Sequence, residues 1–123
     1  MAGNDIRARL LKQRGVLASQ MVKLSFGEVE VREIDSDRLD ILDELIKRED
    51  DKLAPMRLYV AESVHVDGEL LINKAFMDEA GEFDKNILVK ETFKQGDVIK
   101  AYNVLNKLMG FGDAEEEVEE LKN

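Results

Sequence analysis

The sequence predicts a mostly helical α+β fold in which an N-terminal β-hairpin, over about residues 22–34, is packed by helices. Two observations predict it. From Val22 to Phe26, apolar residues alternate with polar ones, which is the period of a half-buried strand. From Leu39 onward, apolar residues recur at spacings of three and four, which is the period of an amphipathic helix. A two-stranded ribbon is only marginally stable alone, so the helices must complete its core.

The expected turn of the hairpin is Gly27-Glu28, because a two-residue turn with glycine first suits a type II′ conformation. This turn places five apolar side chains on one face of the hairpin. A slip of one residue would turn that face to water, so the face is well specified. The cross-strand pairs that follow from the turn are Phe26 with Val29, Leu24 with Val31, and Val22 with Glu33.

The helix expected to cover the hairpin comes next in the chain. Asp35, Ser36 and Asp37 can each cap its first turn. The apolar residues that would lie on the hairpin are Leu39, Leu42, Leu45 and Ile46.

The other expected elements are mostly helices. Residues 56–72 fit either a helix or a second hairpin; a helix to about Ser63 is favoured, and the tight turn at Asp67-Gly68 then leads into a loop or a short second hairpin. The first stretch of the chain fits either an ordered helix or a frayed arm. The expected helices run from Asn4 or Asp5 to about Ser19, from Pro55 to about Ser63, and over 74–80, 84–93 and 97–109.

The helix over 97–109 has the strongest pattern after the hairpin. Asp97 is its expected cap, Gly110 stops it, and Phe111 can fold back on the last turn in a Schellman-type ending. Its apolar stripe is core by default, but part of such a stripe can seat against another chain. The stripe consists of Val98, Ala101, Tyr102, Leu105, Leu108 and Met109.

Length and charge indicate three parts. The chain has 123 residues, enough for one domain with a real core, and a formal net charge of −9 that is unevenly spread. We expect a basic N-terminal arm or helix over 1–20, either native or an appendage. A single α+β domain over 21–112 and an acidic tail over 113–123 follow. An acidic body argues against nucleic acid or a membrane as the partner. Without an apolar spanning run or signal peptide, a cytoplasmic location is expected.

No pattern in the sequence indicates catalysis, a metal site or a cofactor. His65 is the only histidine, and the chain has no cysteine to act as a nucleophile or metal ligand. Asp35-Ser36-Asp37 starts like a calcium loop, but Arg38 intrudes and the later oxygen ligands are missing. We therefore expect a non-catalytic protein that binds another protein and self-associates. The expected partner-binding residues are Val98, Tyr102, Leu105, Met109, Phe111, Arg7, Arg9 and Arg14.

Three stretches resemble tail-assembly chaperones of tailed bacteriophages. They are the Arg-Glu step before a capped helix at residues 31–39, the Val-Asp-Gly turn at 63–69, and the Asn- and Leu-rich helix from 97 that runs into Gly-Phe and acidic residues. The resemblance implies a protein in the host cytoplasm that escorts the aggregation-prone tape-measure protein during tail assembly. The alternative, which rests on the negative charge, is an acidic inhibitor that mimics nucleic acid and binds a host or DNA-processing protein.

Overall fold

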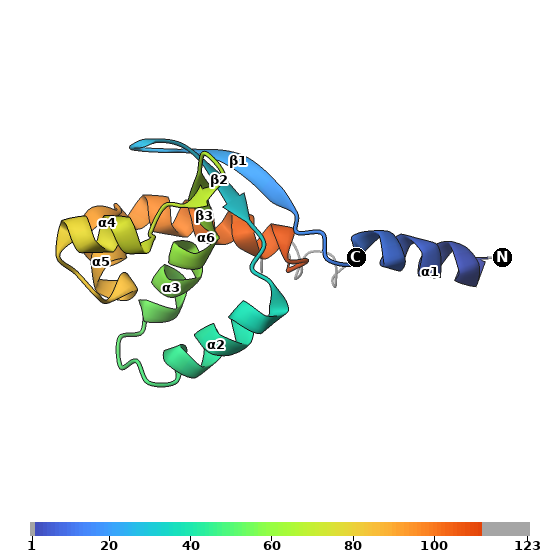
Figure 1. Ribbon diagram of the computed structural model, residues 1–123, viewed down its shortest axis with the longest axis horizontal. Helices are drawn as coiled ribbons and strands as arrows, with labels where there is room; N and C mark the ends of the chain where they lie inside the picture. Colours follow the sequence, from blue (N-terminus) through green and yellow to red (C-terminus); the bar gives the residue numbers. More distant parts are fainter. Residues whose placement is uncertain (1, 112–123) are drawn as a thin grey trace, which may run out of the picture.

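The computed structural model describes residues 2–111, which form an α+β fold with six helices and a four-stranded antiparallel sheet (Figure 1). The predicted fold class is therefore confirmed. The acidic tail expected over 113–123 lies outside the described residues. The elements are α1 (Ala2–Gln13), β1 (Ser19–Leu24), β2 (Gly27–Arg32), α2 (Ser36–Ile46), α3 (Ala54–Ser63), β3 (Val64–Val66), β4 (Glu69–Leu70), α4 (Lys74–Ala80), α5 (Lys85–Thr92) and α6 (Gln95–Leu108).

The hairpin of β1 and β2 turns at Ser25 and Phe26, so the turn predicted at Gly27-Glu28 is wrong. The observed pairs are Leu24 with Gly27, Val22 with Val29, and Gln20 with Val31. The turn lies two residues earlier than predicted, so each residue of β1 pairs with a residue four positions earlier than predicted, and an even shift leaves every side chain on its predicted face. Consequently Val22, Leu24, Val29 and Val31 are buried as expected, whereas Phe26 sits in the turn and is half exposed.

Contacts with distant residues select this turn. The backbone N–H of Ser25 donates to Asp97 Oδ1 at 2.9 Å, and the Ser25 hydroxyl donates to the other oxygen of the same carboxylate. The ring of Phe26 packs edge-on against Phe93 with the ring centroids 5.0 Å apart. Gly27 then begins β2 with a φ of 145°, a value that residues with a Cβ rarely adopt.

Replacing Gly27 with alanine is expected to lower the free energy of unfolding by about 1–2 kcal/mol, because of backbone strain alone. A Cβ at this position would meet no atom within 4 Å, so crowding does not contribute. Gly96→Ala is the matched control: Gly96 lies in α6 without a positive φ, and alanine there should raise stability by about 0.5 kcal/mol. Urea denaturation of both variants measures the difference, and equal stability of the two would contradict the role of φ.

Helices α6 and α3 cover the buried face of the hairpin, and α2 packs mainly against α3. The prediction that the helix after the hairpin lies on it is therefore wrong. Only Leu42 of α2 is buried, whereas α6 buries four residues. The apolar stripe of α6 is thus the better cover for the sheet, although it is distant in sequence. The largest fully buried apolar side chains are Leu42, Ile72, Leu88, Leu105, Val29, Val31, Val60, Val64, Val89 and Val98.

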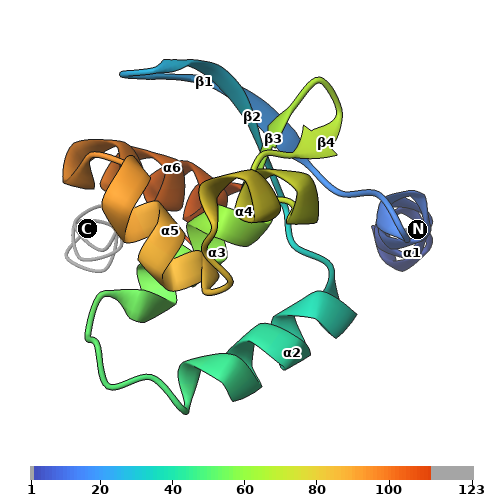
Figure 2. The same cartoon turned by 60° about the vertical axis from the view of Figure 1, so that its left-hand side comes forward.

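A second short hairpin follows α3, which resolves the alternatives for residues 56–72. Asp67 and Gly68 both have positive φ, 53° and 82°, as a two-residue type I′ turn requires. β3 pairs with β2 on one side and β4 on the other, so the sheet order is β1-β2-β3-β4. The second hairpin is visible beside the first in Figure 2.

Helix α6 begins earlier than predicted. Its N-cap is Lys94, which has no side-chain capping bond, and Asp97 is held by Ser25 instead of capping the helix. The predicted ending is confirmed: Gly110 has a φ of 89°, and the N–H of Phe111 donates to the carbonyl of Asn106 at 2.7 Å.

Helix α1 extends away from the rest of the molecule (Figure 1). It ends at Gln13, and Gly15 follows with a φ of 72°, so the helix does not reach Ser19 as predicted. Ser19 is instead the first residue of β1, and the N–H of Glu33 donates to the carbonyl of Ala18 at 2.8 Å just before it. The side chains of residues 3–13 are all exposed.

Candidate functional site

An open groove of about 430 Å³ lies between α2, α3 and the end of α6. Figure 2 shows α2 set apart from α3, with α6 beyond it. We call this the client groove, after the function proposed below. Its lining residues are Leu39 and Asp43 of α2, Tyr59 of α3, and Tyr102, Leu105, Asn106, Met109 and Phe111 of α6 and its end.

Two tyrosines form the centre of the client groove. The rings of Tyr59 and Tyr102 lie 6.2 Å apart, centroid to centroid, and are tilted by 41°. The Tyr59 hydroxyl donates to Asp43 Oδ1 at 2.7 Å, which links α3 to α2. Burial, together with the hydrogen bond to Asp43, raises the pKa of Tyr59 from 10.0 to about 12. The groove therefore offers the aromatic surface of two tyrosines, together with one hydrogen-bonded polar pair, the Tyr59 hydroxyl and the Asp43 carboxylate.

Tyr59 should ionise late in an alkaline titration. We expect a Tyr59 step near pH 12, measured by the ultraviolet absorbance of tyrosinate, and this step should disappear in Tyr59→Phe and remain in Tyr102→Phe. Because the pKa is higher in the folded chain, the folded state binds the proton more tightly. The resulting stability is present below pH 10 and is lost as the pH rises to about 12. Loss of the step in Tyr102→Phe alone would contradict the assignment.

The structure brings together some of the predicted partner-binding residues. Tyr102, Met109 and Phe111 line the client groove, and Leu105 forms its floor with 1% of its surface exposed. Val98 is 2% exposed and belongs to the core, not to the groove. Arg7 and Arg9 lie on α1 and Arg14 just after it, and none of the three lines the groove.

The prediction from sequence missed half of the groove. Leu39 and Asp43 are four residues apart on α2 and therefore share a side of that helix. Tyr59 contributes from α3 and Asn106 from α6. The available signal was that Tyr59 and Tyr102 are the only tyrosines of the chain, each within an amphipathic helix.

A second groove, of about 320 Å³, lies on the other side of α2, and we call it the outer groove. Its lining is largely apolar, and Phe83 at its rim is 82% exposed. Its apolar residues are Leu42, Leu45, Leu58, Met77 and Phe83; its charged residues are Arg38, Glu49, Glu62, Asp84 and Lys85.

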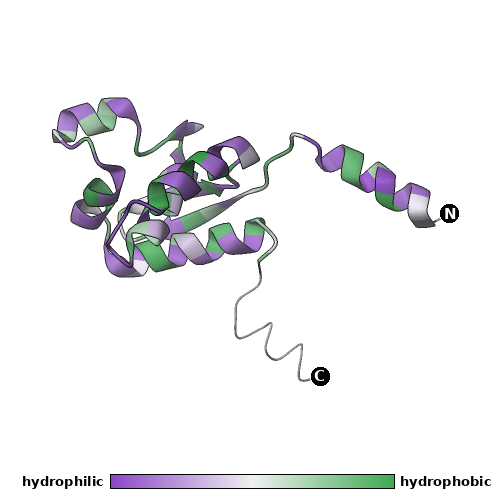
Figure 3. Cartoon of the chain, turned by 90° about the horizontal axis from the view of Figure 1, so that it is seen from below, coloured by the Kyte–Doolittle hydropathy of each residue, from purple (hydrophilic) through white to green (hydrophobic). Residues whose placement is uncertain are grey.

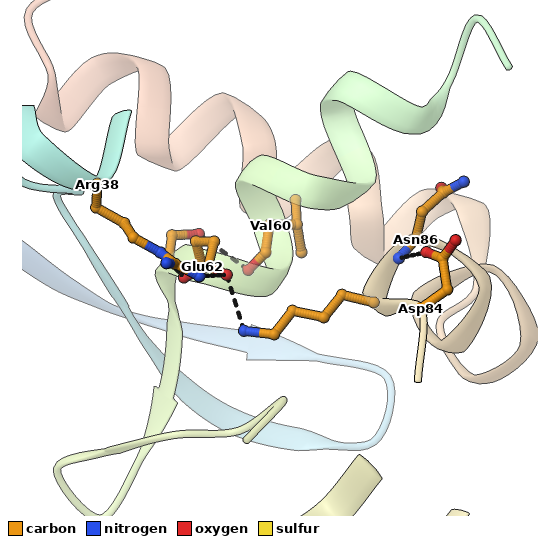
Figure 4. A network of polar contacts seen from close by, with 7 residues as sticks. Arg38, Val60, Glu62, Asp84 and Asn86 are labelled. Carbon is orange, nitrogen blue, oxygen red and sulfur yellow. Dashed lines mark hydrogen bonds and ion pairs between the residues drawn. The ribbon is translucent and has the colours of Figure 1, made fainter. Parts of the chain in front are cut away.

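A buried carboxylate joins three helices next to the outer groove. Glu62 of α3 has 4% of its side chain exposed and accepts two hydrogen bonds from the Arg38 guanidinium of α2, at 2.9 and 2.7 Å. Lys85 of α5 donates to the same carboxylate at 2.8 Å. Figure 4 shows Arg38 directed at Glu62. Burial by itself would raise the pKa of Glu62, but the bonds from Arg38 and Lys85 outweigh burial and lower it.

His65 lines a shallow depression with Glu62, Arg38 and Lys85. Its Nδ1 lies 2.8 Å from the carbonyl oxygen of Ser63, and both oxygens of Glu62 are occupied by Arg38 and Lys85. Within residues 2–111, no hydrogen bond joins His65 to Glu62. Across the same described stretch, no group of three or more His, Cys, Asp or Glu side chains is placed to hold a metal ion.

Comparisons of the chain with protein-family models, curated protein sequences and solved structures found no match. None of the helices within residues 2–111 combines the length and the apolar content needed to cross a membrane.

Proposed function

We propose that this chain is a non-catalytic protein-binding factor whose client groove receives an apolar helix of another polypeptide. The observation that carries the proposal is the groove itself, in which aromatic and apolar side chains of three helices line an open surface depression. Amphipathic helices dock into such grooves through residues spaced by three and four. Tyr59 and Tyr102 are the residue type that most often anchors such contacts.

Both exposure and polarity of the groove fit this role. Phe111 at the end of α6 is 60% exposed, so its ring offers apolar surface for a partner to cover. Asp43 and the Tyr59 hydroxyl satisfy each other, so a client helix would leave neither group buried without a partner. The negative charge of the whole chain, −9, would keep a complex with an apolar client in solution.

The resemblance to tail-assembly chaperones suggests the class of client. In that reading, the protein escorts helical segments of a tape-measure protein and is released before the tail is complete. The escort makes and breaks no covalent bond. The protein acts by covering apolar surface of the client that would otherwise cause aggregation.

Co-expression with the tape-measure protein of the same genome tests the proposal. The full chain is expected to keep that protein in the soluble fraction and to co-purify with it. Met109→Glu places a charge in the groove and should abolish both effects. Ile99→Glu is the matched control, because Ile99 is an exposed residue of α6 outside the groove lining. Equal behaviour of the two variants, or an insoluble client with the unaltered chain, would overturn the proposal.

A second candidate function is the acidic inhibitor, which the surface of α2 favours. Asp37, Asp40 and Glu44 are all exposed and follow at spacings of three and four, so they lie on one face of that helix. A decoy of this kind should lose its partner in the triple variant Asp37→Asn, Asp40→Asn, Glu44→Gln. A client-binding factor should keep its client in the same variant, because these residues do not line the client groove.

A further inference from the structure

Helix α1 is amphipathic and its apolar side is uncovered. Ile6, Leu10 and Leu11 are 56%, 60% and 67% exposed, although an apolar stripe of this kind is normally buried against another element. Figure 3 shows apolar and polar positions interleaved along the helix. Apart from Asp5, its charged residues are all basic: Arg7, Arg9 and Lys12.

The outer groove has complementary properties. Leu45 and Phe83 expose 43% and 82% of their surface at its rim, and Leu42 and Leu58 form its base. The two basic residues of its lining, Arg38 and Lys85, are both bound to Glu62. The two other charged residues of the lining, Glu49 and Asp84, are both acidic.

We infer that α1 of one copy packs in the outer groove of a second copy, with Ile6 and Leu10 against Leu45 and Phe83. Charge complementarity selects this occupant, since a basic helix meets a groove in which Arg38 and Lys85 are bound to Glu62 and the other two charges, Glu49 and Asp84, are acidic. Length agrees as well: α1 has 12 residues and α2 has 11, so each is about 16–18 Å long. If both copies exchange their helices, the contact closes as a two-fold dimer.

The second copy, and not the same chain, supplies the groove. α1 points away from the body in Figures 1 and 3, and Gly15, which follows the helix, has a left-handed φ of 72°. Residues 14–18 then connect it to β1, whose first residue pairs with Arg32 at the end of β2. The client groove on the other side of α2 stays open in such a dimer, so the interface and the proposed client site are separate.

Two surface variants test the exchange by complementation. Leu10→Glu places a charge on the apolar side of α1, and Phe83→Ser removes apolar surface from the rim of the outer groove. Both residues are exposed in the single chain, so neither substitution is expected to disturb its fold. The unaltered chain should show twice its 14.0 kDa mass in light scattering, with weaker association at high salt. Each variant alone should associate at least about tenfold more weakly. An equimolar mixture should regain a dimer, because the intact helix of Phe83→Ser fits the intact groove of Leu10→Glu.

Other outcomes overturn the inference. If both variants stay dimeric, the interface is elsewhere on the chain. If the unaltered chain is a monomer at high concentration, or if the mixture associates no better than its parts, α1 does not join two copies through this groove. Ile99→Glu is the control and should dimerise normally, since it lies outside both grooves. The solubility of a tape-measure client is read separately, so failure here does not depend on the proposed function.

Discussion

Replacing Leu42 with alanine is expected to lower the free energy of unfolding by about 3 kcal/mol. Leu42 is 1% exposed and is the only buried residue of α2, so its loss leaves a cavity and removes the main apolar contact of that helix. Urea denaturation measures the total change. Hydrogen exchange should show α2 opening before the sheet and α6, because few other buried contacts hold it.

Ile41→Ala is the matched control for Leu42→Ala. Ile41 is the neighbouring residue on the same helix and is 49% exposed, so its truncation should change stability by no more than about 0.5 kcal/mol. A similar loss in both variants would mean that general helix propensity, and not the buried contact, holds α2 in place.

Replacing Glu62 with alanine is expected to cost about 2–3 kcal/mol, near the lower limit for breaking a buried ion pair. The loss leaves the amine of Lys85 and the guanidinium of Arg38 without their acceptor, but Arg38 is 42% exposed and can turn to water. Glu30→Ala is the control. Its pair with Arg32 lies at the surface, with about a third of each side chain exposed, and should contribute less than about 1 kcal/mol.

Acid should reproduce part of the effect of Glu62→Ala. The folded chain lowers the pKa of Glu62 below its ordinary 4.5, so the unfolded chain binds the proton more readily. The contribution of Glu62 is therefore complete above pH 4.5 and is lost as the pH falls through the lower pKa of the folded state. Stability curves from pH 7 downward should fall less steeply for Glu62→Gln than for the unaltered chain. Parallel curves would contradict the assignment.

Local patterns predicted the buried face of the hairpin but not its turn. Alternation determines which side chains share a face, and an even shift in the pairing register does not change that face. The turn depends on Ser25 meeting Asp97 and on Phe26 meeting Phe93, both far along the chain. These contacts have no local signature in the sequence. The sequence therefore favoured a turn that begins at Gly27, the residue that follows the observed turn.

The candidate site, too, could be predicted from local patterns only in part. The stripe of α6 identified Tyr102 and Met109 through helical spacing, and the predicted Schellman-type ending identified Phe111. Leu39 and Tyr59 complete the groove only through the arrangement of α2, α3 and α6 in space. Order along the chain suggested that α2 would cover the hairpin, but its acidic face and single buried leucine suit the periphery.

The two sides of the client groove are anchored unequally. Near its start, α6 is tied to the hairpin by Asp97 and by Lys100, which donates to the carbonyl of Lys23 at 2.6 Å. α2 is attached through the buried Leu42 and through the bonds that Arg38 makes to Glu62 and Asp43 makes to Tyr59. α6 is thus the fixed wall of the groove and α2 the wall with fewer attachments, so a wider ligand is expected to displace α2 and leave the sheet in place.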